Sequence, residues 1–141
     1  MKLIPVDKDN RNAYRKFENA EDLSCYLSRI YPDLEASYLK WMYIEEDGNY
    51  IGSVWLEGQD TRRAKLGIFI ADPAYRDKGI GKYAIQKMIS LAKSDGIDII
   101  TLNVRVGNLR ARKVYAACGF KEEKRFKKEN GIEAFSMELE L

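Results

Sequence analysis

The sequence predicts a mixed α/β domain of the α+β type, with a central sheet of six to seven strands flanked by helices. Two observations predict this class. In the first half, apolar and alternating segments are separated by turns rich in Gly and Asp, as in an antiparallel meander. In the second half, a strand, an amphipathic helix and another strand follow one another, which requires a crossover and a parallel pair. At 141 residues, the chain is expected to be one domain over residues 1–141.

The first half is expected to contain strands at residues 2–6, 41–46, 50–57 and 63–70. Asp47-Gly48 separates two of these strands and predicts a tight hairpin turn. Residues 7–40 are expected to be helical, in two pieces interrupted near Pro32, because apolar residues recur there at helical spacing. The second piece is expected to begin at an Asp33 cap.

The second half is expected to open with a helix over residues 79–94, ended by Gly96 as its C′ residue. A strand at 99–106 and a short helix at 108–118 follow. The last two strands, 120–128 and 132–141, form a hairpin around Asn130-Gly131.

Composition excludes several classes of function. The chain is 45% hydrophobic and 33% charged, with a net charge of +2 and interleaved charges, so no nucleic-acid partner is expected. No apolar run approaches the roughly 18 residues of a membrane span, and no membrane partner is expected. Residues 1–5 are too short for a signal peptide, and the protein is expected to be cytoplasmic.

The residues available for catalysis are also restricted. The chain has no histidine, which removes the commonest general base and any histidine-ligated metal. Cys25 and Cys118 lie far apart in sequence on apolar helix faces, and both are expected to be reduced and unactivated. No metal site is expected.

A basic, glycine-containing stretch over residues 75–82 lies between an apolar strand and the first residues of an amphipathic helix. Gly79 and Gly81 allow backbone N–H groups to close on an anion, and the helix N-terminus adds unpaired donors. Arg76, Lys78 and Lys82 add positive charge. The stretch predicts a phosphate-binding turn; the alternative is a basic strand-to-helix turn that simply needs glycine.

A dinucleotide-binding motif is a second alternative, because residues 79–84 fit G-x-G-x-x-A. However, residues 71–78 separate the motif from its strand. The acid expected about 20 residues further on is also missing from the next strand. This alternative predicts binding of NAD.

The residues Arg76-Asp77-Lys78-Gly79-Ile80-Gly81 resemble the R/Q-x-x-G-x-G/A signature of the GCN5-related N-acetyltransferase (GNAT) family. A second block also resembles this family: Leu102-Asn103-Val104, Asn108, Ala111, Tyr115 and Gly119-Phe120. The resemblance covers residues 65–123 and implies the GNAT fold, acetyl-CoA as co-substrate and transfer of acetyl to an amine.

The resemblance also implies roles for individual residues. The pantetheine arm would bond the backbone of the strand that carries Ile68 to Ile70, and one N–H there would stabilise the thioester oxyanion. The residues implied in cofactor binding are Ile68, Phe69, Ile70, Arg76, Asp77, Lys78, Gly79, Ile80, Gly81, Lys82, Asn108 and Tyr115.

Tyr115 is the predicted catalytic residue. A phenol with an ordinary pKa near 10 can protonate the departing thiolate at neutral pH. From spacing alone, Tyr115 also fits one apolar helix face with Val114 and Cys118, and Asn108 also fits a helix N-cap. The resemblance favours the functional roles.

One departure from the family concerns the general base. Many relatives carry a glutamate where Lys65 stands, and a lysine is no base unless its pKa is strongly depressed. Glu46 and Glu57 are candidates, although exposed carboxylates at hairpin ends are the more favoured reading of both. The base therefore stays unassigned.

The predicted reaction is direct attack of a primary amine, on a small molecule or a peptide, within a ternary complex. The alternative is a non-catalytic CoA-binding sensor or interaction domain. The acidic first half weakly favours a cationic acceptor. A homodimer is compatible with the sequence, which does not identify the acceptor or the range of acyl groups.

Overall fold

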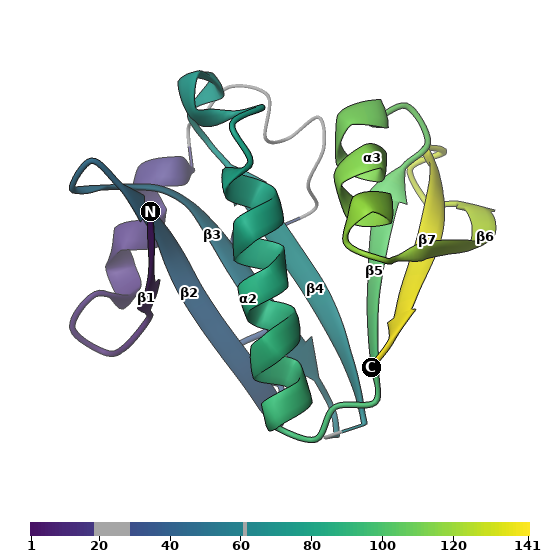
Figure 1. Cartoon of the computed structure of the whole chain (residues 1–141), viewed down its shortest axis with the longest axis horizontal. Coiled ribbons are helices and arrows are strands. Elements are labelled where there is room, and N and C mark those ends of the chain that lie inside the picture. Colours follow the sequence, from purple (N-terminus) through teal and green to yellow (C-terminus); the bar gives the residue numbers. More distant parts are fainter. Residues whose placement is uncertain (19–28, 61) are drawn as a thin grey trace.

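The computed structural model describes residues 1–18, 29–60 and 62–141. Its seven strands form one sheet in the order β1-β2-β3-β4-β5-β7-β6 (Figure 1). The strands are β1 (Lys2–Pro5), β2 (Tyr38–Glu46), β3 (Asn49–Gly58), β4 (Arg63–Ile70), β5 (Ile99–Arg105), β6 (Lys121–Lys127) and β7 (Glu133–Glu140). The helical elements are η1 (Arg11–Phe17), η2 (Pro73–Tyr75), α2 (Ile80–Ser94) and α3 (Leu109–Ala117).

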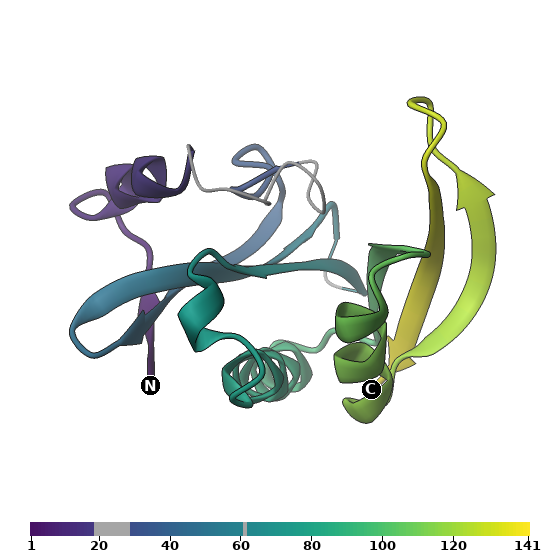
Figure 2. The ribbon, with the colours of Figure 1, turned by 90° about the horizontal axis from the view of Figure 1, so that it is seen from above.

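The sheet separates two apolar clusters. On one face, α2 buries Ile80, Ala84, Ile85, Met88 and Ala92 against the strands. On the other face, aromatic rings pack together in a second cluster of Phe17, Trp41, Tyr43, Trp55 and Phe69. Figure 2 shows α2 and α3 on the first side and η1 on the second, with the tip of the β6–β7 hairpin bent toward the side of η1.

Most of the expected elements are confirmed. β4 has the predicted bounds. α2 and β5 differ from theirs by one residue at one end, and α3 by one residue at each end. Asp47 and Gly48 both have positive φ, 52° and 78°, as a type I′ turn requires. Gly96 has φ 83° and donates to Lys93 O at 3.2 Å, which ends α2 as predicted.

The expected helices over residues 7–40 are largely wrong. η1 is one short 3-10 helix, and residues 19–28 lie outside the described part of the chain. Residues 29–37 form turns and bends, and β2 begins at Tyr38, which pairs with Gly58 in the sheet. Pro32 disfavours helix in the residue before it. Asp33 accepts the Glu35 N–H at 3.0 Å in a local turn instead of starting a helix.

The parallel pair β4–β5 is short. Only Arg63–Lys65 pair with Ile99–Thr101, and the two strands then diverge (Figure 1). The remaining residues of β4 keep their pairing with β3 as far as Ile70. β4 therefore has one open edge over Leu66–Ile70, next to the start of α2. Among the described residues, no helix is long and apolar enough to cross a membrane.

Candidate active site

The open edge of β4 carries backbone groups that point toward β5. Ala71 N–H donates to Ile51 O at 2.8 Å on the β3 side. Because successive residues of a strand direct their backbone groups to opposite edges, Phe69 also faces β3, whereas Ile68 and Ile70 face β5. The divergence of the strands leaves Ile68 without a β5 residue in register.

The three residues predicted to bind the pantetheine arm, Ile68, Phe69 and Ile70, therefore do not all face the same edge of β4. Ile68 offers both N–H and C=O, while the Ile70 carbonyl accepts from Arg76 Nε at 3.1 Å and Nη2 at 2.9 Å. Phe69 contributes its ring to the aromatic cluster, 5.1 Å from the Phe17 centroid. Of the three predicted residues, Ile68 and Ile70 direct backbone groups to this edge and Phe69 does not.

The stretch Tyr75–Lys82, which we call the anion cradle, leads into α2. Gly79 is the N-cap with φ 80°, and no side chain caps the helix. The first bond of the helix runs from Tyr83 N–H to Gly79 O at 3.0 Å. The N–H groups of Ile80, Gly81 and Lys82 precede it and have no acceptor within the helix. Their direction and the helix dipole suit an anion.

The two cradle glycines have different reasons to be glycine. Gly79 needs its positive φ of 80°, which other residues rarely adopt. Gly81 has no such need, and a Cβ there would meet only Ile70 Cδ1, at an ordinary 3.8 Å. Packing therefore does not explain Gly81. A glycine here leaves the backbone of the first turn of α2 open to a close approach.

The charged side chains of the cradle do not all point the same way. Arg76 braces the end of β4 through Ile70, as described above. Asp77, with φ 61°, bonds Arg110 of α3 at 3.1 Å, and this ion pair is exposed. Lys78 Nζ lies 6.0 Å from the Tyr75 ring centroid. Arg76 thus shapes the cradle, while Lys78 and Lys82 supply its positive charge.

Asn108 caps α3, as the structural alternative predicted. Its Oδ1 accepts the Ala111 N–H at 3.3 Å. The amide nitrogen keeps its two donor hydrogens, so the cap is compatible with a ligand contact. α3 lies beside α2 and carries Tyr115 in its last turn (Figure 1).

Tyr115 is half-buried and packs on the main core, 6.1 Å from the Phe120 ring centroid. Burial, followed by the nearby Cys118 thiol, raises the pKa of Tyr115 to about 12. Lys82 also acts on Cys118, which places the end of α3 near the first turn of α2. The phenol therefore stays protonated at neutral pH, the state that a proton donor needs.

The described residues offer no activated thiol and no metal centre. Burial raises the pKa of Cys118 and outweighs the opposing charge of Lys82, so the thiol is a poor nucleophile at neutral pH. Cys25 lies outside the described residues. Within residues 1–18, 29–60 and 62–141, no three Asp, Glu or Cys side chains are grouped as metal ligands.

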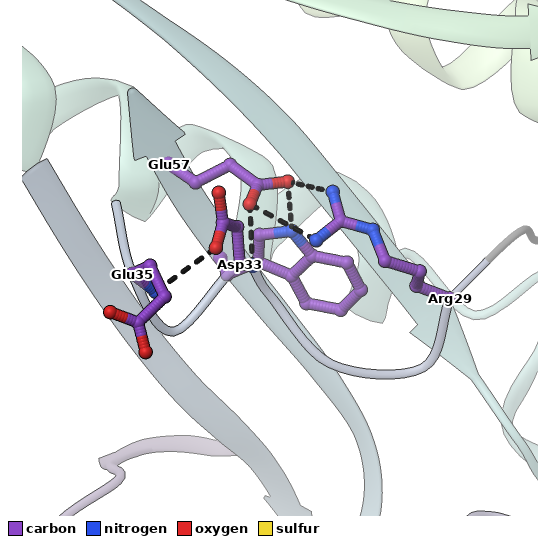
Figure 3. A network of polar contacts seen from close by, with 5 residues as sticks. Arg29, Asp33, Glu35 and Glu57 are labelled. Carbon is purple, nitrogen blue, oxygen red and sulfur yellow. Dashed lines mark hydrogen bonds and ion pairs between the residues drawn. The ribbon is translucent and has the colours of Figure 1, made fainter. Parts of the chain in front are cut away.

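Glu57 is the centre of a polar network on the aromatic side of the sheet (Figure 3). Its side chain is only 8% exposed and forms an ion pair with Arg29. The Asp33 N–H donates to Oε2 at 2.6 Å, and Trp55 Nε1 donates to Oε1 at 3.4 Å. Both carboxylate oxygens are therefore engaged.

The sequence-based reading of Glu57 as an exposed carboxylate is wrong. Strand alternation puts Glu57 on the same face as Trp55 and Ser53, and this periodicity was the available signal for burial. The partners Arg29 and Asp33 come from a segment expected to be helical, and no local pattern indicates that they meet Glu57. Glu46 bonds the N-terminal amine at 3.5 Å and remains half-buried.

The site combines donors at a helix start, an open strand edge beside it and a protonated phenol on the adjoining helix. The amino-acid sequence matches the Acetyltransferase (GNAT) family over residues 6–120. The chain belongs to this family. The expected family and fold are thereby confirmed.

Two relatives show how far the sequence likeness extends. Mycothiol acetyltransferase of Beutenbergia cavernae is 28% identical over 83 residues, which are 58% of this chain and 28% of that protein. An uncharacterized N-acetyltransferase of Methanocaldococcus jannaschii is 33% identical over 101 residues, covering 61% of this chain and 45% of that protein. The chain thus spans less than half the length of these relatives.

The fold extends over nearly the whole chain. The structure of spermidine N-acetyltransferase from Vibrio cholerae, in complex with CoA and spermine, superposes on this GNAT domain with a TM-score of 0.78. The identity is 20%, and the alignment covers 99% of this chain and 94% of that one. At this identity, the likeness shows a shared fold.

Proposed function

We propose that this GNAT domain transfers acetyl from acetyl-CoA to a primary amine of a small molecule or peptide, by direct attack in a ternary complex. The observation that carries the proposal is the position of the anion cradle beside the open edge of β4. Gly81 and Ile70 join the two, since a Cβ on Gly81 would lie 3.8 Å from Ile70 Cδ1. One extended ligand can therefore occupy both.

Coenzyme A has chemical groups that match both parts. Its pyrophosphate suits the N–H groups of Ile80, Gly81 and Lys82 and the charges of Lys78 and Lys82. Its pantetheine amides suit the backbone of Ile68 and Ile70, as an added strand would. The Nδ2 amide of Asn108 is a further donor at the start of α3.

In the proposed reaction, the amine nitrogen attacks the thioester carbonyl carbon, and the new C–N bond replaces the C–S bond. The Ile68 N–H is oriented to stabilise the carbonyl oxygen as it gains charge. Tyr115 donates its proton to the departing thiolate and is reprotonated from solvent. The proton lost by the amine leaves to water.

Glu57 does not suit the role of general base. Its two oxygens already accept from Arg29, Asp33 and Trp55, so neither of them is free to face an incoming amine. The neutral amine is therefore the proposed nucleophile, without a carboxylate base.

Release of free CoA thiol in the presence of varied primary amines tests this proposal. A rate above the hydrolysis rate with at least one amine is expected. If no amine raises the rate while CoA still protects the protein against heat, the domain is a non-catalytic CoA binder. Protection by NAD but not by CoA would instead support a dinucleotide site.

A further inference from the structure

A pocket of about 280 Å³ lies beside the Arg29–Glu57 ion pair, at the end of β3. Its charged lining residues are Arg29, Asp33, Glu57 and Lys65. The Asp33 N–H donates to Glu57 Oε2 at 2.6 Å (Figure 3), and Lys65 is the cross-strand partner of Glu57. Directly opposed side chains of an antiparallel pair point to the same face of the sheet. These contacts direct four charged groups to one small space.

Two of the four charges neutralise each other, and two do not. Arg29 and Glu57 form an ion pair. Asp33 Oδ1 accepts only the Glu35 N–H, at 3.0 Å. Within residues 1–18, 29–60 and 62–141, no cation lies within 4 Å of the Asp33 carboxylate, and no carboxylate lies within 4 Å of the Lys65 ammonium. The pocket therefore offers one carboxylate and one ammonium to a ligand.

This pocket lies where the open edge of β4 begins. Lys65 is the last β4 residue that pairs with β5. Ile68, whose N–H is proposed to stabilise the oxyanion, follows three residues later, roughly 10 Å along the strand. The anion cradle adjoins the other end of this edge, at Ile70. Coenzyme A and an acceptor held in the pocket would thus approach Ile68 from opposite ends.

The two unpaired charges restrict the kind of ligand. A purely anionic group is attracted by Lys65 and repelled by Asp33, and a purely cationic group meets the reverse. A group with a carboxylate and an ammonium on one carbon can satisfy both residues, as the head group of an α-amino acid does. The volume of about 280 Å³ suits a group of this small size.

We propose that the acceptor is a diamino acid whose α-carboxylate binds Lys65 and whose α-ammonium binds Asp33, so that its side-chain amine is acetylated. This inference rests on the proposed acetyl transfer and names the class of its acceptor. The side-chain nitrogen forms the C–N bond, and the thiolate leaves with the proton of Tyr115, as in the general reaction. Asp33 favours the charged form of the α-amine, which keeps that amine from attacking the thioester.

Four amines with the same reacting end test the proposal. Lysine carries both charges at its far end, 6-aminohexanoate keeps only the carboxylate, cadaverine keeps only the ammonium, and pentylamine has neither. Lysine is expected to have the highest kcat/KM, about fivefold or more above each of the others, with Nε-acetyllysine as its product. The amide of Nα-acetyllysine represents a lysine residue inside a peptide and is expected to react no better than pentylamine.

Variants of the two pocket residues should change the order of the amines. Asp33→Asn keeps an oxygen for the Glu35 N–H and removes the charge, so 6-aminohexanoate should become at least as good an acceptor as lysine. Lys65→Gln should have the same effect for cadaverine. Both changes are expected mainly in KM, because the head group lies away from the reacting carbon. Glu35→Gln and Lys121→Gln are matched controls at exposed residues that do not line the pocket, and they should leave the order unchanged.

Two results would overturn the proposal while leaving acetyl transfer intact. One is a kcat/KM for 6-aminohexanoate or cadaverine equal to that for lysine in the wild-type protein. The other is a wild-type order of the four amines in both Asp33→Asn and Lys65→Gln. If no amine reacts, acetyl transfer fails, and heat protection of the CoA-bound protein tests the pocket by itself. Lysine should then raise Tm more than 6-aminohexanoate or cadaverine does, and equal protection would exclude the head-group site.

Discussion

The indole of Trp55 lies across Gly67, so that a Cβ at Gly67 would come within 2.2 Å of the indole Cε2. This contact allows Trp55 Nε1 to reach Glu57 at 3.4 Å. Gly67→Ala is therefore expected to displace the indole and lower the free energy of unfolding by about 1–3 kcal/mol, as overpacking does. Urea unfolding measures the change. An unfolding midpoint equal to that of the wild-type protein would contradict the contact.

Gly81→Ala is the contrasting change, because a methyl group fits there in the unliganded protein. Replacing a glycine in the first turn of α2 should raise the free energy of unfolding by about 0.5 kcal/mol. The same methyl group would stand where the backbone meets the pyrophosphate. We expect CoA affinity to fall about tenfold or more, as measured by calorimetry.

Gly81→Ala is thus expected to raise stability and to lower CoA affinity, and each expectation is tested separately. A destabilised Gly81→Ala protein would mean that folding requires Gly81. Unchanged CoA affinity would move the phosphate site away from the anion cradle. Gly96→Ala is a matched control, because this glycine has positive φ and lies at the far end of α2. It should lower stability without changing CoA affinity.

Local patterns predicted the elements around the cofactor site well. Apolar periodicity and the glycines at 79 and 96 define α2. The apolar pattern of the strands, together with the turns that flank them, defines β4 and the last hairpin. These signals extend over neighbouring residues, so a single sequence contains them. The open edge of β4 was implied only by family resemblance, because the divergence from β5 depends on the packing of the whole sheet.

The acceptor side was predicted poorly because its contacts join distant segments. Glu57 is buried by Arg29, which lies 28 residues away in sequence. Residues 38–40 were expected to end the helical segment, yet pairing of Tyr38 with Gly58 extends β2 through them. No local pattern contains this information.

Tyr115→Phe tests the proton donor. The ring and its packing against Phe120 are kept, so stability and CoA affinity should change little. If the phenol protonates the thiolate, kcat should fall about 100-fold or more. Steady-state kinetics with one good acceptor measures this. A kcat within twofold of wild type would assign Tyr115 to the core alone.

The pH dependence of kcat/KM is expected to reflect the Tyr115 phenol and the acceptor amine. The pKa of Tyr115 is raised to about 12, so the phenol keeps its proton as the solution becomes alkaline. Activity should rise about tenfold per pH unit below the pKa of the acceptor amine, as its neutral fraction grows. No falling limb from Tyr115 is expected below about pH 11. A plateau beginning near pH 6 would instead indicate an enzyme carboxylate or amine acting as base.

Glu57→Gln separates a structural carboxylate from a catalytic one. The amide cannot accept from all the donors that meet the carboxylate, and Arg29 loses its counter-charge. Since the Arg29 side chain is 40% exposed, the expected loss of stability is about 1–3 kcal/mol, below that of a fully buried pair. Glu138→Gln breaks the more exposed pair with Arg63 and should cost less than about 1 kcal/mol.

Activity then decides the role of Glu57. Measured well below its unfolding temperature, Glu57→Gln should keep kcat within about tenfold of wild type, because the neutral amine needs no carboxylate base. The slope of kcat/KM with pH should also stay unchanged. A loss of about 1,000-fold in a folded, CoA-binding variant, with a flattened pH profile, would make Glu57 the base. The proton would then leave through the aromatic side of the sheet, past Trp55 and Arg29.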